Sequence, residues 1–180
     1  MKPRLVPLVI VALALFALLA GYATDRQPSP AYASTTASAA SANTVDFDGV
    51  GDVRLGQRDA DLTRLGALTQ PAAACGPALT ATSAADPVFA DGELVLLWVH
   101  PPLTTPEGIG EGSPLATAQA TYPQATAMTA PAGSYQFDGL MVTSGDRAYL
   151  FMHDGQTVRK VVVGYTEPVQ RLFTHGIGNC

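Results

Sequence analysis

Short apolar stretches separated by turn residues fill the second half of the chain. Asp91-Gly92, Ser144-Gly145-Asp146 and Asp154-Gly155 are sequences typical of tight hairpin turns. Such turns join antiparallel strands, whereas parallel strands need long crossover connections that this spacing does not leave room for. We therefore expect antiparallel hairpins. The predicted strands are 88–90, 93–99, 139–143, 147–153 and 157–165.

Two shorter segments, 58–65 and 114–122, have the spacing of an amphipathic helix. Ser113 is the expected N-cap of the second helix, and Gly66 the expected end of the first. Both helices are too short to be stable alone, so we expect them to pack on one side of the sheet. The predicted fold class is therefore α+β. The expected contact residues are Leu62, Leu65, Leu115, Ala118 and Tyr122.

Apolar side chains occupy both faces of the segment 94–99, which includes Trp98. A half-exposed strand would alternate between polar and apolar residues. The strand is therefore either internal, with both faces covered, or it presents one apolar face to a partner. The segment 147–153 also has apolar side chains on both faces, but less strongly, and Tyr149 and His153 lie on the same face.

The N-terminus has the order of a secretory signal peptide. Lys2 and Arg4 precede an apolar run at 5–20 that is shorter than the roughly 20 residues of a membrane-spanning helix. We predict a signal peptide at 1–23, with cleavage as late as 33 as an alternative. An uncleaved segment is the only membrane attachment that we expect.

A linker follows the predicted signal peptide. Tyr22 stands where a lipid-bearing cysteine would be in an otherwise lipobox-like sequence, so we expect no acylation there. Ala, Ser, Thr and Pro dominate 24–45, which is too poor in apolar residues to pack. We therefore predict a disordered linker at 24–45 and a single α+β domain at 46–180.

The charge of the chain is moderately acidic. The net charge is −5 over 180 residues. Cleavage after residue 33 would remove three basic residues and one acidic residue, leaving 7 basic and 14 acidic. The predicted domain contains no cluster of Lys and Arg. Nucleic acid and anionic membrane surfaces are therefore disfavoured partners, because both require concentrated positive charge.

The chain has two cysteines, Cys75 and Cys180. In an oxidising compartment such a pair is most simply a disulfide, which we predict. Closing a loop of this length would stabilise the fold by about 4 to 5 kcal/mol in the chain-entropy model. A metal site is the alternative, but the sequence has no CxxC spacing and no nearby histidine ligand set.

Two short glycine motifs suggest an internal repeat. Residues 48–52 and 107–111 both read acidic-Gly-β-branched-Gly-acidic, and each precedes a predicted helix. We predict pseudo-repeats at about 46–103 and 104–175.

This layout resembles the tandem α/β repeats of the β-lactamase-inhibitor-protein type, and also the small envelope lipoproteins of the SmpA/OmlA (BamE-like) fold. The segments that carry the resemblance are 49–56, 108–114 and 149–163. Two features depart from these families: the lipobox cysteine is absent, and the Cys75–Cys180 pair does not look like a bridge within each repeat. Inhibition of a β-lactamase is therefore an analogy between folds.

Familiar catalytic patterns are absent from the sequence. It has no G-x-S-x-G elbow and no phosphate-binding loop. His100, His153 and His175 are scattered, without a second ligand at metal-binding spacing, and the turn at Asp154 explains the acidic residue beside His153. We predict no catalytic, cofactor or metal residues, and lean against an enzyme.

The expected function is that of a non-catalytic binding module of the cell envelope, secreted or extracytoplasmic. The expected partner is another envelope protein or a wall component, held on an aromatic face that includes Trp98, Tyr149 and His153. An envelope hydrolase and a purely structural protein are the alternatives. The sequence leaves the oligomeric state open.

Overall fold

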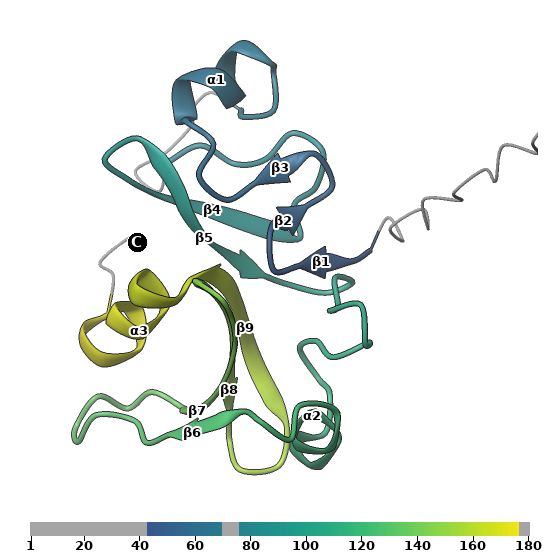
Figure 1. The fold of residues 1–180 in the computed structure, drawn as a ribbon, viewed down its shortest axis with the longest axis vertical. Helices are drawn as coiled ribbons and strands as arrows, with labels where there is room; N and C mark the ends of the chain where they lie inside the picture. Colours follow the sequence, from purple (N-terminus) through teal and green to yellow (C-terminus); the bar gives the residue numbers. More distant parts are fainter. Residues whose placement is uncertain (1–42, 70–75, 177–180) are drawn as a thin grey trace, which may run out of the picture. The chain divides into compact units, whose positions relative to one another are not determined.

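Two antiparallel sheets form the framework of the protein (Figure 1). The computed structural model describes residues 43–69 and 76–176, which form one three-stranded sheet, one six-stranded sheet and three short helices. The fold class is α+β, as the sequence predicts. None of the helices in these ranges is long and apolar enough to cross a membrane. Cys75 and Cys180, and the predicted signal peptide, lie outside the described residues.

The small sheet comprises β1 (Val45–Asp46), β2 (Gly49–Val50) and β3 (Val53–Arg54). The chain then enters α1 (Asp59–Arg64). The valines of these strands are buried and belong to the same hydrophobic cluster as Leu62 of α1. Strands of two residues are too short to show a period in the sequence, which is why pattern analysis does not find them.

The large sheet contains all five strands predicted from the sequence. Its spatial order is β4-β5-β9-β8-β7-β6, and only β6 was not expected. β5 and β9 lie side by side although the chain between them forms four other elements, and they pair from Leu96↔Gly164 to Val99↔Val161. The strands are β4 (Ala85–Ala90), β5 (Glu93–Val99), β6 (Thr126–Met128), β7 (Asp138–Ser144), β8 (Arg147–His153) and β9 (Val158–Tyr165).

The Asp91-Gly92 hairpin turn shows why the sequence predicts strand positions well. Asp91 has φ +51° and Gly92 φ +77°. A two-residue turn with both central residues in the left-handed region matches the twist of the strands it joins, and Asp-Gly tolerates it best. The turn residues thus fix the positions of β4 and β5.

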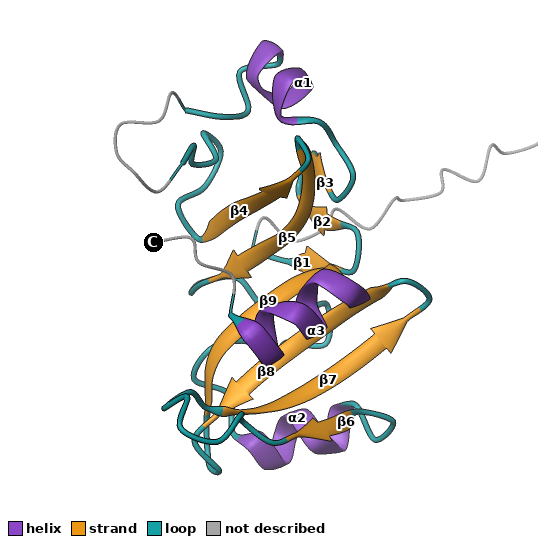
Figure 2. Cartoon of the chain, turned by 90° about the vertical axis from the view of Figure 1, so that its left-hand side faces the viewer, coloured by secondary structure: helices purple, strands orange, loops and turns teal. Residues whose placement is uncertain are grey.

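Each face of the large sheet has its own hydrophobic cluster. Tyr149 and Phe151 of β8 belong to one cluster, which also includes residues of α1, α2 (Leu115–Thr121) and the small sheet. Leu150 and Met152 belong to the other, which lies under α3 (Thr166–His175). Figure 2 shows α3 crossing in front of β8 and β9. β5 is an internal strand whose apolar residues belong to both clusters, although Val95 and Trp98 are only partly buried.

The helix boundaries differ from the prediction at two residues. Ser113 is not an N-cap: its Oγ accepts the N–H of Gly110 at 3.0 Å, and Pro114 occupies the cap position without a side-chain bond. Leu65 was expected to face the sheet with Leu62, but it is 74% exposed. Leu65 is the C-cap of α1 and keeps helical backbone geometry, so its exposure shows that the buried face of this short helix is narrow and reaches Leu62 but not Leu65.

The sequence prediction missed α3. Its buried residues Val169, Leu172 and Phe173 do have helical spacing. Pro168 lies within the segment and argues against a helix interior. It is the third helical residue, however, and the first N–H groups of a helix have no intrahelical acceptor, so a proline costs little there.

The helices α1 and α2 are joined to the large sheet by matching backbone contacts. The N–H of Gly56 donates to the carbonyl of Leu94 at 2.8 Å, and the N–H of Gly112 donates to the carbonyl of Val158 at the same distance. Both glycines have positive φ, +85° and +89°. Two residues separate each glycine from the helix that follows it. The segment before α1 therefore contacts the start of β5, and the segment before α2 contacts the start of β9 in the same way.

The glycine motifs that suggested a repeat do not themselves adopt one conformation. Residues 48–52 include β2, whereas 107–111 form no strand. In the structure, Gly56 of the first half corresponds to Gly112 of the second half. This pairing is shifted by three residues from the one obtained by aligning the two glycine motifs.

Candidate functional site

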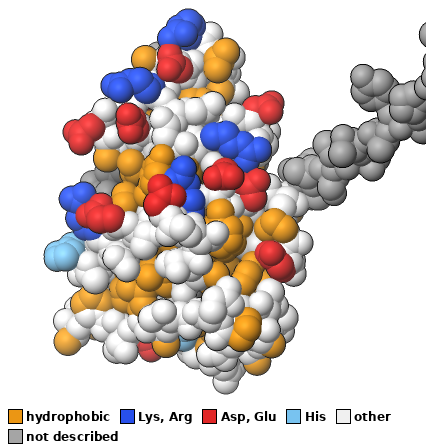
Figure 3. Space-filling view, viewed as in Figure 1, with side chains coloured by type: hydrophobic (Ala, Val, Ile, Leu, Met, Phe, Trp, Pro, Cys, Tyr) orange, Lys and Arg blue, Asp and Glu red, His pale blue; other side chains and the backbone are white. Residues whose placement is uncertain are grey.

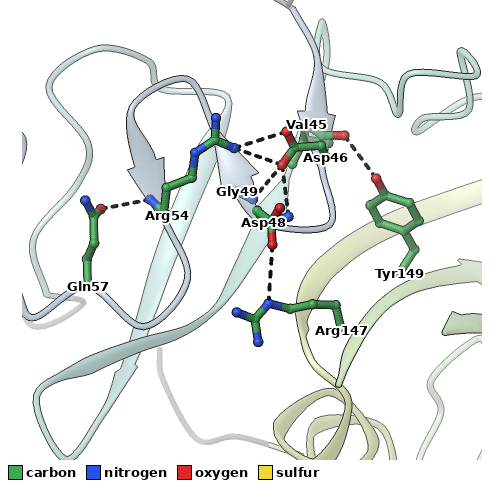
Figure 4. A network of polar contacts seen from close by, with 8 residues as sticks. All are labelled: Val45, Asp46, Asp48, Gly49, Arg54, Gln57, Arg147 and Tyr149. Carbon is green, nitrogen blue, oxygen red and sulfur yellow. Dashed lines mark hydrogen bonds and ion pairs between the residues drawn. The ribbon is translucent and has the colours of Figure 1, made fainter. Parts of the chain in front are cut away.

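Tyr149, expected on an exposed aromatic face, is buried. Its exposed fraction is 1%, and its ring stacks on Phe47 with 4.0 Å between centroids. Its hydroxyl donates to the carbonyl of Val45 at 3.3 Å (Figure 4). Burial raises the pKa of Tyr149 above its ordinary value, so the hydroxyl stays protonated and able to donate. Tyr149 therefore attaches the small sheet and cannot contact a partner, which corrects the expectation.

Ion pairs beside Tyr149 support the same attachment (Figure 4). Arg54 contacts Asp46 at 3.0 Å within the small sheet. Arg147 of β8 reaches Asp48 at 3.8 Å, and its guanidinium lies 3.8 Å from the centroid of the Tyr165 ring. These charged groups lie close to one another and connect the small sheet to β8, although the buried Nε of Arg147 makes no hydrogen bond within the described residues.

His153, the second expected contact residue, is used by the turn that follows it. Its Nδ1 accepts the N–H of Gly155 at 3.2 Å. Asp154 accepts the N–H groups of Gln156 at 2.9 Å and Thr157 at 2.8 Å. These backbone donors, with Arg159, lower the pKa of Asp154 to about 2. Asp154 thus acts as a turn residue, the interpretation that the sequence favoured over an acid/base pair.

Trp98 lies on the opposite face of the sheet from Tyr149. In the register of the large sheet, Trp98 pairs with Val162, and Val162 pairs with Leu150. Paired residues share a face and neighbours along a strand alternate, so Trp98 belongs to the side covered by α3. The ring is partly buried at the margin of that cluster. Trp98 and Tyr149 therefore cannot form one surface, and the predicted set of three residues is not brought together.

An open depression of about 360 Å³ surrounds Trp98 instead. Strands β4, β5 and β9 contribute to it, together with the loop before α2. Within the described chain, none of the side chains lining it carries a hydroxyl or a thiol. The lining residues are Asp86, Trp98, Val99, His100, Glu111, Arg159, Lys160 and Val161.

The imidazole of His100 lies between two carboxylates. Its Nε2 donates to Asp86 Oδ2 at 2.9 Å, and its Nδ1 is 3.9 Å from Glu111 Oε2. The backbone N–H of His100 donates to the carbonyl of Ala84 at 2.7 Å, which holds this end of β5 against the start of β4. The ring is thereby oriented, while all three side chains remain in contact with solvent.

Charged side chains of both signs line the depression. Lys160 places its Nζ over the Trp98 ring, 5.7 Å from the centroid, so the ammonium covers part of the ring face. Arg159 is already paired with Asp154 at 2.6 Å. Asp86 and Glu111 therefore face one lysine and one histidine, and no excess of positive charge remains.

The rest of the visible surface shows a similar balance. On the face drawn in Figure 3, Lys/Arg and Asp/Glu side chains are intermixed over the upper half, which contains α1 and the small sheet. The lower half of this face carries few charged side chains. This face therefore has no basic patch of the kind that would hold a polyanion.

The sequence prediction found Trp98 but missed its neighbours. Asp86 is 12 residues from Trp98 along the chain and directly opposite it in the β4–β5 register, and Lys160 becomes a neighbour only because β9 pairs with β5. The Asp91-Gly92 turn alone would pair Asp86 with Leu97, and it is the register shift between Val88 and Phe89 that places Asp86 opposite Trp98. No local sequence signal exists for Lys160 either.

Neither metal-site geometry nor known relatives identify the depression. No group of three or more His, Cys, Asp or Glu residues in the described ranges is arranged to hold a metal ion. Comparisons of the chain with protein-family models, with curated proteins and with solved structures each find no match. The function must therefore be argued from the residues themselves.

Proposed function

We propose that this protein is a non-catalytic binding module that works outside the cytoplasm and holds its ligand in the depression around Trp98. The observation that carries the proposal is a partly exposed aromatic ring that lines an open depression together with polar side chains. Ligand sites commonly combine an apolar contact surface with a few oriented polar side chains. Export is supported by Lys2, Arg4 and the apolar run at 5–20.

The geometry also explains why the strand bearing Trp98 has this composition. β5 is the second strand of the sheet, and its remaining apolar residues contribute to the two hydrophobic clusters. α3 covers the same face as Trp98 but leaves the ring partly accessible. The sheet and helix thus provide a rigid support, which reduces the entropy lost when a ligand is bound.

Retention on envelope material tests this proposal. The exported protein is mixed with isolated cell-wall and membrane fractions of the cell that produces it, and the bound share is measured. Truncating a central aromatic contact typically weakens binding by tenfold or more, so we expect Trp98→Ala to lower apparent affinity roughly tenfold.

Tyr135→Ala is the matched control, because Tyr135 is an exposed aromatic residue outside the depression. It should bind like the wild type. Equal binding by the wild type and Trp98→Ala would contradict the proposal, and so would an equal loss in both variants.

An envelope hydrolase is the second candidate, favoured by one observation. A histidine oriented by carboxylates, as His100 is by Asp86 at 2.9 Å, is how a general base is often held. The lining of the depression supplies no hydroxyl or thiol nucleophile, so water would have to be the attacking group. Turnover of wall material that disappears in His100→Gln would favour this function over binding.

A further inference from the structure

We propose that the ligand of the depression is a saccharide, an inference that rests on the binding function proposed above. A pyranose ring has a face of C–H groups and an edge of hydroxyl groups. The depression combines two kinds of surface, an indole ring and a set of polar side chains from two strands and from the residues between β5 and α2.

The apolar part of the match is Trp98. Its inner edge packs on the cluster under α3, which fixes the ring, while its outer part borders the depression. The Lys160 ammonium, 5.7 Å from the ring centroid, lies on a long flexible side chain that can move as a ligand arrives. A sugar ring can then stack on the indole.

The polar part of the match is the mixture of donors and acceptors. Asp86 and Glu111 only accept hydrogen bonds when ionised, Lys160 only donates, and His100 can do either. Hydroxyl groups donate and accept, so one sugar can satisfy all of these side chains. A ligand with only acceptors, such as a phosphate, would face two carboxylates.

The charge of the depression favours a ligand without strong net charge. Arg159 is paired with Asp154, and Lys160 faces the carboxylates of Asp86 and Glu111, so the depression has no excess of positive charge. A polyanion would find no excess positive charge, and a polycation would compete with Lys160. A neutral saccharide avoids both penalties. The open shape of the depression suits a ring that stacks against its wall.

The experiment uses the fact that Trp98 is the single tryptophan of the chain. The exported protein is titrated with a β-1,4-linked N-acetylglucosamine tetramer, and intrinsic tryptophan fluorescence is recorded. We expect a saturable change in emission. An alanine tripeptide serves as the comparison probe and should leave the emission unchanged.

Two variants that keep Trp98 then assign the polar contacts. Loss of a charge-assisted hydrogen bond should weaken the apparent affinity for the sugar roughly tenfold in Asp86→Asn and in Lys160→Ala. Asp52→Asn, an exposed aspartate in the turn before β3 and outside the depression, should bind like the wild type. All three changes are at exposed positions, and unfolding midpoints should confirm that the variants are folded.

The outcomes separate this inference from the proposed function. If the sugar leaves Trp98 emission unchanged while envelope retention still depends on Trp98, the ligand is not a saccharide and the binding function stands. A response to the tripeptide instead of the sugar also overturns the inference. If the sugar leaves the emission unchanged and envelope retention does not depend on Trp98 either, both proposals fail.

Discussion

Tyr135 is held in an unusual backbone conformation at the surface. It lies in the loop between β6 and β7 with φ +54°, and its side chain is fully exposed. A bulky residue in the left-handed region is strained by about 1 to 2 kcal/mol. The next residue, Gln136, donates its side-chain N–H to the carbonyl of Phe173 at 2.7 Å, which helps to hold the loop.

We expect Tyr135→Gly to stabilise the protein by about 0.5 to 1 kcal/mol. Glycine relieves the strain at positive φ, and the larger freedom of the unfolded glycine offsets part of this gain. No packing is lost, because the tyrosine side chain is exposed. The free energy of unfolding in urea measures the effect.

Tyr135→Ala is the control for this change, since alanine also lacks the ring but keeps the strained Cβ. It should leave the unfolding free energy near that of the wild type. A glycine variant less stable than the alanine variant would show that the left-handed conformation is not what strains this loop.

At the level of elements, the pairing of β5 with β9 unites the two halves of the large sheet. Gly164 lies opposite Leu96 in this register. A Cβ placed at Gly164 would be 2.5 Å from the Cβ of Leu96 and 2.7 Å from the carbonyl oxygen of Val95. Backbone atoms cannot move aside as a flexible side chain can, so glycine at this position lets the strands approach.

Gly164→Ala should therefore lower the free energy of unfolding by about 2 to 3 kcal/mol through overpacking. Gly133→Ala provides the comparison, because a Cβ at Gly133 would meet no atom within 4 Å and would carry only the cost of φ +78°. That backbone cost is about 1 kcal/mol. Chemical denaturation of both variants tests whether Gly164→Ala lowers the free energy of unfolding more than Gly133→Ala does. Equal decreases would contradict the role of Gly164 as a contact residue.

For the whole molecule, the sequence predicts a disulfide between Cys75 and Cys180. The final residue of the chain would then be covalently tied to the first half of the domain. A disulfide stabilises mainly by restricting the unfolded chain, and the restriction grows slowly with the length of the closed loop.

The exported protein should contain no free thiol, and its mass should increase by two hydrogen atoms on reduction. Cys180→Ser should lower the free energy of unfolding by about 4 to 5 kcal/mol if the chain-entropy model holds. The double variant Cys75→Ser/Cys180→Ser is the control, and it should lose no more than the single variant does. Two reactive thiols in the folded, exported protein would refute the predicted bridge.

Sequence alone determined five of the six strands of the large sheet and the hairpin turns between them. Alternation of side chains and residues such as Asp91-Gly92 act over a few neighbouring positions, so their effect can be predicted locally. It also determined that β5 is apolar on both faces. α3 carried a visible helical period, but Pro168 obscured it because the position of a proline within a helix matters as much as its presence.

Tertiary structure decided which residues meet at the candidate site. Lys160 joins Trp98 through the pairing of β5 with β9, and Tyr149 is separated from Trp98 because the two side chains point to opposite faces of one sheet. Such contacts depend on which distant segments pair and in what register. That choice is made by the packing of the whole core, and no local pattern records it.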